Sequence, residues 1–191
     1  MAPFDDDHPQ PGTLTWPERI ENYRRTVGTP YLGHENGWTY GTWIMGNSYR
    51  KRTDYYGGFQ GNLLKRVDAL FPDRRLPLHV FAGKVDLAAF PGDTLDINAD
   101  LQPTYAVNAE TCEGVPLHCY DLVLADPPYS GSDAEHYGTA MVNRNKVMAT
   151  LATGLPSGAF VVWLDQVRPM YSKAELKNEA VIGIEIGRAH V

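Results

Sequence analysis

The hydrophobic positions of the chain gather in short runs separated by polar, Gly- and Pro-containing segments, a pattern typical of an α/β protein. Four runs have the length of buried strands, and they lie at 77–82, 93–97, 120–125 and 160–165. A helix is expected at 139–152, with a shorter helix of one or two turns between the first two strands. Because strands that alternate with helices form parallel sheets, we predict a mostly parallel sheet with ligands at the carboxyl ends of its strands.

The first third of the chain has a different pattern. Residues 1–16 are acidic and Pro-rich and are expected to be disordered. A short helix is predicted at 17–27, and apolar side chains at helical spacing predict another at 62–71, with Asn62 as its N-cap. Residues 28–62 are rich in Gly, Tyr, Asn and Trp, which favours loops with short extended pieces. We expect residues 17–184 to form a single domain.

The composition changes this picture little, since 43% of the 191 residues are hydrophobic and 21% are charged, as in ordinary globular proteins. No apolar run is long enough to span a bilayer, and the first residues lack a signal-peptide pattern. We therefore expect a soluble cytoplasmic protein. Cys112 and Cys119 lack the spacing of metal ligands and are expected to be free thiols, so no metal site is predicted.

The net charge of -6 argues against a general polyanion binder. The basic residues nevertheless cluster in the first 79 residues, as Arg24-Arg25, Arg50-Lys51-Arg52, Lys65-Arg66 and Arg74-Arg75. A surface that faces phosphates would lie there, although charge alone favours an ordinary solvated surface.

Four consecutive residues, Asp126-Pro127-Pro128-Tyr129, directly follow the apolar run at 120–125. A loop in this position leaves the carboxyl end of a parallel strand, where such sheets bind ligands. The Asp126 carboxylate and the Pro127 carbonyl can each accept one N–H of a nucleobase amino group, which directs the nitrogen lone pair toward a methyl donor. Tyr129 offers a ring for stacking on a base taken out of the duplex. The plainer alternative is a rigid Pro-Pro turn that begins with Asp126.

With this motif the chain resembles the DNA amino-methyltransferases of the D-P-P-Y type, and most closely their small phage-type adenine members. The resemblance covers roughly residues 39–184. It implies a Rossmann-like S-adenosylmethionine-dependent methyltransferase fold, S-adenosyl-L-methionine as cofactor and DNA with a flipped adenine as partner. Asp126, Pro127, Pro128 and Tyr129 would be the catalytic residues, and the reaction would require no metal.

The resemblance also implies cofactor-binding residues, although that part of the pattern is less complete. The glycine-rich turn of the family stands here as Phe81-Ala82-Gly83-Lys84-Val85, in which Val85 replaces the second glycine. Asp96, at the end of the second strand, would accept the ribose hydroxyls of the cofactor. The remaining candidates are residues near the cofactor's adenine ring and one aromatic residue upstream, namely Asn108, Glu110 and Tyr56. An ordinary strand-to-helix turn at 81–85 is the alternative.

Candidate DNA contacts lie on both sides of the first strand. The run Arg50, Lys51 and Arg52 could bind phosphates, and Tyr137 belongs to a polar segment at 130–138 that we expect to be a mobile loop able to close on the base.

The C-terminal end departs from the family. Residues 185–191, EIGRAHV, match the translation of a widely used sequencing adapter, which indicates a non-native tail that makes no packed contribution. Residues 181–184, VIGI, would begin the antiparallel hairpin that closes the sheet in such methyltransferases. We therefore expect this chain to be truncated, with that hairpin incomplete.

Several functions are compatible with this sequence. Methylation of cytosine N4 more often uses S-P-P-Y, so Asp126 favours adenine N6. RNA or a protein glutamine amide is another possible acceptor class, and a catalytically decayed nucleic-acid-binding relic of the fold is a different kind of protein.

Overall fold

A computed structural model describes residues 12–28, 31–46, 61–136 and 140–187. These residues divide into two compact units. The first is built mainly from 74–85 and 91–176, and the second contains the described residues of 13–73 together with 86–90 and the C-terminal strand. This division was not part of the prediction of a single domain over residues 17–184.

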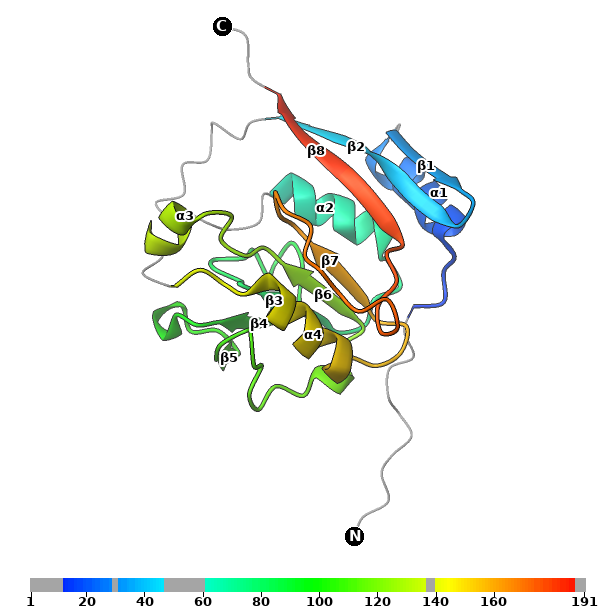
Figure 1. Cartoon of the computed structure of the whole chain (residues 1–191). Coiled ribbons are helices and arrows are strands. Elements are labelled where there is room, and N and C mark those ends of the chain that lie inside the picture. The colour runs from blue at the N-terminus through cyan, green and yellow to red at the C-terminus, as the bar shows by residue number, and fades with distance from the viewer. Residues whose placement is uncertain (1–11, 29–30, 47–60, 137–139, 188–191) are drawn as a thin grey trace, which may run out of the picture. The chain divides into compact units, whose positions relative to one another are not determined.

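The first unit contains a five-stranded sheet. Its strands are β3 (Pro77–Val80), β4 (Asp93–Asp96), β5 (Tyr105–Ala106), β6 (Leu122–Ala125) and β7 (Phe160–Trp163). They lie in the order β5-β4-β3-β6-β7, and every neighbouring pair is parallel (Figure 1). Counted from β3, this is the 3-2-1-4-5 order of a Rossmann-like sheet, and the order reverses between β3 and β6. Sheets of this kind bind ligands at that position. The predicted α/β class and parallel sheet are confirmed.

Helix α4 (Arg144–Gly154) covers one face of this sheet (Figure 1). Its Val147 and Leu151 are fully buried, and they belong to one core cluster with strand residues Leu78, Val80, Leu95, Val123 and Ala125. The helix begins later than the predicted residue 139, because the Asn143 side chain accepts a hydrogen bond from the Lys146 amide and caps it. Burial of two large aliphatic side chains stabilises this packing by about 3–6 kcal/mol.

The other connections of the first unit are short. They include 3₁₀ turns η1 (Ala99–Leu101) and η2 (Leu117–Cys119) and the helix α3 (Gly131–His136). The predicted loop at 130–138 therefore contains one short helix. The prediction of a short helix between β3 and β4 is wrong, since turns occupy that segment. There the Asp86 carboxylate accepts the amides of Ala88 and Ala89 as a helix N-cap does, but Pro91 follows after a single turn and the helix does not continue.

The second unit combines α1 (Trp16–Val27) and α2 (Gly61–Leu70) with a three-stranded sheet of β1 (Tyr31–Glu35), β2 (Trp38–Gly46) and β8 (Ala180–Gly187). The two helices are joined through Arg19, which is 1% exposed and pairs with Asp73 at 2.6 Å while donating to the Leu70 carbonyl. The prediction of α2 is confirmed, but the helix begins at Gly61, so Asn62 lies inside it and is not its N-cap.

Strands β1 and β2 form an antiparallel hairpin in a segment for which the sequence analysis predicts loops. The turn consists of Asn36 and Gly37, whose φ angles are 52° and 78°. Two consecutive left-handed residues make the type of turn that matches the twist of hairpin strands, and Asn-Gly is its preferred sequence. The Asn36-Gly37 dipeptide, which lies between segments rich in aromatic residues, was therefore the sequence signal for this hairpin.

Strand β8 corrects two expectations about the C-terminal residues. Residues 181–184 do not extend the five-stranded sheet in a closing hairpin, because β8 pairs in parallel with β2 of the second unit. The strand also continues beyond Ile184, with Glu185, Ile186 and Gly187 in register with residues 44–46. The prediction that 185–191 make no packed contribution is therefore wrong for 185–187, and 188–191 lie outside the described residues.

Candidate active site

The loop Asp126–Tyr129 leaves the carboxyl end of β6, as predicted. The Asp126 amide donates to the Val80 carbonyl at the end of β3, at 3.4 Å. On the other side of β6, the Leu164 amide donates to the Ala125 carbonyl at 2.9 Å. These contacts place the start of the loop between the ends of β3 and β7, beside the point between β3 and β6 where the strand order reverses.

Asp126 and Tyr129 are joined directly. The Tyr129 hydroxyl donates to Oδ1 of Asp126 at 2.5 Å, so a short hydrogen bond closes the four-residue loop on itself. Burial raises the pKa of the Asp126 carboxyl to about 6; the Tyr129 hydrogen bond opposes that shift, and the nearby Asp165 charge adds to it. Tyr129 therefore contacts the carboxylate, in addition to the stacking role predicted for its ring.

This pKa gives a testable pH dependence. An ionised Asp126 can accept an amino N–H with either oxygen, whereas the protonated form loses acceptor capacity. For the methyl transfer that the resemblance implies, kcat is expected to rise about tenfold per pH unit up to about pH 6 and then level off. The measurement is kcat for methyl transfer between pH 4.5 and 8.5 at saturating cofactor. An acid limb centred near pH 4 would mean that Asp126 is not the group that titrates.

The turn after β3 has an unusual backbone. Phe81 and Gly83 have φ angles of 58° and 52°, in the left-handed region that favours glycine. A non-glycine residue there costs on the order of 1–3 kcal/mol, and such strain clusters at functional sites. The Phe81 ring meets the Trp163 ring of β7 edge to face, with centroids 6.5 Å apart. Phe81 and Gly83 therefore both have the left-handed backbone conformation that glycine residues usually adopt in a glycine-rich turn.

Asp96 ends β4 beside this turn. Its Oδ2 accepts the Gly83 amide and its Oδ1 accepts the Asn98 amide, each at 2.9 Å. The Ala82 amide also donates to the Leu95 carbonyl, at 3.2 Å. The structure therefore brings the predicted residues Ala82, Gly83 and Asp96 together, and it shows that Asp96 holds the turn.

Asn108 and Glu110 lie in the loop between β5 and η2. The Asn108 side chain accepts the Glu110 amide at 2.8 Å, and Glu110 accepts the Asn143 amide at 2.9 Å. That hydrogen bond, opposed by partial burial and aided by Lys146, lowers the pKa of Glu110. Both residues anchor this loop near the start of α4, and their predicted contact with a cofactor stays a prediction.

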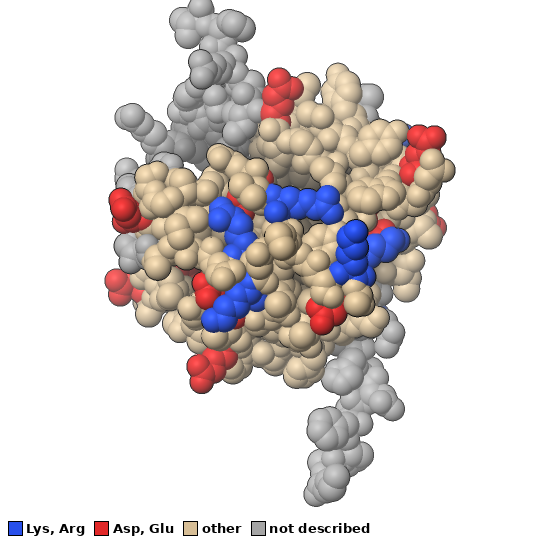
Figure 2. Space-filling model, in the orientation of Figure 1, with Lys and Arg blue, Asp and Glu red and all other residues tan. Residues whose placement is uncertain are grey.

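Five predicted site residues lie outside the described part of the chain, namely Tyr56, Arg50, Lys51, Arg52 and Tyr137. Other members of the basic clusters have protein partners. Arg66 donates to the Tyr23 hydroxyl and lies over the Trp43 ring, and Arg24 pairs with Glu21. In Figure 2, basic and acidic side chains are interspersed on the face shown, which is not a uniformly basic surface.

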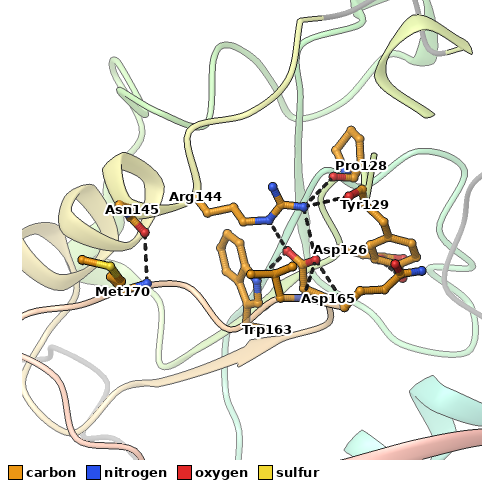
Figure 3. Close-up of polar contacts among 10 residues, drawn as sticks. Asp126, Pro128, Tyr129, Arg144, Asn145, Trp163, Asp165 and Met170 are labelled. Atoms are coloured by element: carbon orange, nitrogen blue, oxygen red, sulfur yellow. Dashed lines mark hydrogen bonds and ion pairs between the residues drawn. The ribbon is translucent and has the colours of Figure 1, made fainter. Parts of the chain in front are cut away.

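Sequence reasoning missed a polar network beside the loop, formed by Arg144, Trp163 and Asp165 (Figure 3). Arg144 pairs with Asp165 at 2.5 Å and donates to the carbonyls of Pro128 and Tyr129, both at 3.2 Å. The available signal was an acidic residue shortly after the apolar strand FVVW, a position like that of Asp126 after β6.

Three further findings concern metal ligands, cysteines and membrane-spanning helices. The described residues contain no group of three or more His, Cys, Asp or Glu that could hold a metal ion. Cys112 and Cys119 are free, and burial raises the pKa of the Cys112 thiol to about 11, so it is protonated at neutral pH. Within the described ranges, each helix is too short or too polar to cross a membrane.

No protein family, curated protein or solved structure matches this chain. The functional assignment therefore depends on the geometry of the site and on the motif itself.

Proposed function

We propose that the chain is an S-adenosylmethionine-dependent methyltransferase that modifies an exocyclic amino nitrogen of DNA, with adenine N6 as the target. The observation that carries this proposal is the Asp126–Tyr129 loop at the carboxyl end of β6, beside the point where the strand order reverses. Ligands of Rossmann-like sheets bind at this point, and the loop presents two acceptors in a fixed arrangement.

The acceptors suit an amino group. Such a nitrogen is a poor nucleophile, because its lone pair is delocalised into the base. Among the described residues, only Tyr129 donates to the Asp126 carboxylate and none donates to the Pro127 carbonyl. Each acceptor can therefore take one N–H of the target, which favours a pyramidal nitrogen whose lone pair faces the methyl donor. Proline residues stiffen this loop and add no competing amide.

Asp96 and the Phe81–Gly83 turn would hold the cofactor, which supplies a methyl group on a sulfonium. These residues fit the ribose of the cofactor because Asp96 has acceptor capacity left for its hydroxyls. Each Asp96 oxygen accepts one backbone amide and keeps a lone pair for a ribose hydroxyl. Gly83 has a left-handed backbone and no side chain, so a ligand can approach closely.

Replacing Asp96 with alanine should weaken S-adenosylmethionine binding about 10- to 100-fold, which corresponds to the roughly 1–3 kcal/mol lost when a buried hydrogen-bond partner is removed. Calorimetry with the purified protein provides the measurement. Asp100→Ala is the matched control, since Asp100 is an exposed carboxylate in the adjoining η1 turn. Unchanged affinity in Asp96→Ala would place the cofactor elsewhere.

The substrate is tested by incubating the protein with unmodified DNA and isotope-labelled S-adenosylmethionine, followed by mass analysis of the nucleosides. Labelled N6-methyladenine is the expected product. Label only in N4-methylcytosine, RNA or protein glutamine would replace the adenine assignment. Cofactor binding without transfer to any acceptor would indicate a catalytically decayed relic.

A further inference from the structure

Arg144 connects the Asp126–Tyr129 loop to helix α4 and to the segment that follows β7. It is the first residue of α4, and its Nε and Nη2 contact the two carboxylate oxygens of Asp165 at 2.5 and 3.2 Å. The same Nη2 also lies 3.2 Å from the carbonyl oxygens of Pro128 and Tyr129, so its two hydrogens are shared among these oxygens and Oδ1 of Asp165 (Figure 3). The planar guanidinium suits this arrangement because its donors have a fixed fork geometry.

Asp165 is itself fixed. Its side chain is 1% exposed, and it accepts the Trp163 indole N–H at 3.2 Å and the Gln166 amide at 2.7 Å. Burial would raise the pKa of Asp165, but the hydrogen bonds from Arg144, the Val167 amide and Trp163 hold that pKa below its ordinary value. An ionised, immobile carboxylate therefore holds Arg144 in one orientation.

The Asp126–Tyr129 loop depends on hydrogen-bond donors from outside the loop, such as Arg144. Pro127 and Pro128 have no amide hydrogen, so the loop can form few hydrogen bonds of its own. By taking the carbonyls of Pro128 and Tyr129, Arg144 fixes two of the peptide planes of the loop. The preceding carbonyl, that of Pro127, is left as the acceptor to which no described residue donates.

We propose that Arg144, held by Asp165, is a positioning residue for methyl transfer, because it fixes the loop that presents Asp126 and the Pro127 carbonyl to the target amino group. This inference rests on the proposed function. Arg144 does not contact Asp126 through any hydrogen bond in the network, so its effect passes through the backbone of Pro128 and Tyr129. A displacement of about 1 Å in such a loop can cost on the order of 100-fold in rate.

The test compares Arg144→Lys and Arg144→Met with wild type. Lysine keeps the charge and can pair with Asp165, but its single ammonium cannot also hold two carbonyls in the guanidinium geometry. Both variants should lower kcat by about 10- to 100-fold with unchanged S-adenosylmethionine affinity. Arg144→Lys should melt near wild type and Arg144→Met below it. Arg168→Met is the control, because Arg168 is an exposed arginine of the same unit that contacts Tyr171 in its own loop.

A second readout does not depend on activity. Amide hydrogen exchange of residues 129–132 should be faster in both Arg144 variants and unchanged in Arg168→Met. The proposal is overturned if hydrogen exchange at residues 129–132 is unchanged in the Arg144 variants. It is also overturned if Arg144→Lys, which should melt near wild type, has wild-type kcat, because the loss in Arg144→Met would then reflect lower stability alone. If wild type neither binds the cofactor nor transfers methyl, the proposed function fails and the positioning role fails with it. In that case, faster amide exchange in the Arg144 variants would show only that Arg144 stabilises the loop.

Discussion

Replacing Asp126 with alanine is expected to lower the rate of methyl transfer by about 10²–10³, the usual loss when one oriented hydrogen-bonding group is removed from a reacting centre. The affinity for S-adenosylmethionine should not change, since Asp126 is assigned to the target base. Single-turnover transfer and calorimetry on the same preparation separate the two effects. Near-full activity of Asp126→Ala would contradict the role given to this carboxylate.

Asp126→Asn provides a control that keeps the shape of the side chain. Burial raises the pKa of Asp126 to about 6, against about 3.9 for an unfolded aspartate. An acid whose pKa is raised by folding destabilises the folded state at pH values above that pKa. The neutral variant should therefore be more stable than wild type above pH 6, and this advantage should disappear below about pH 4. A variant that gains stability while losing activity cannot owe its inactivity to unfolding.

Replacing Asp165 with alanine should lower the free energy of unfolding by about 3–5 kcal/mol, because it leaves the Arg144 guanidinium without its buried partner. Trp163 and two backbone amides lose an acceptor at the same time. Urea denaturation measures the change. The double variant Arg144→Met, Asp165→Leu should recover much of this loss, since replacing both partners by apolar groups is often close to neutral. A loss below about 1 kcal/mol for Asp165→Ala would mean that the pair behaves as an exposed one.

The sequence predicted the parts of the fold that local pattern determines. Apolar runs located β3, β4, β6 and β7 to within a few residues, and the position of Asp126 after such a run placed the candidate site at the carboxyl end of β6. The hairpin at Asn36 and Gly37 was also present as a local signal, but the abundance of Gly and aromatic residues around it favoured a loop.

The features that sequence did not predict depend on contacts between distant residues. β8 pairs with β2, and nothing in the residues 180–187 specifies that partner. Arg144 and Asp165 each have an unremarkable local setting, and only the alignment of β6, β7 and α4 brings them to the same loop. The left-handed backbone of Phe81 has no sequence signal, because this conformation is rare for aromatic residues.

The strand order also has a kinetic consequence. All four ladders of the five-stranded sheet are parallel, so none of them closes through a short hairpin. Pairings between residues far apart in sequence slow folding, because the entropy of loop closure is lost before the contacts stabilise the sheet. Asp126 and Asp165 come together only after β6 and β7 have both paired. During synthesis, therefore, the candidate site is completed only once residue 165 has left the ribosome, long after the β1–β2 hairpin can form.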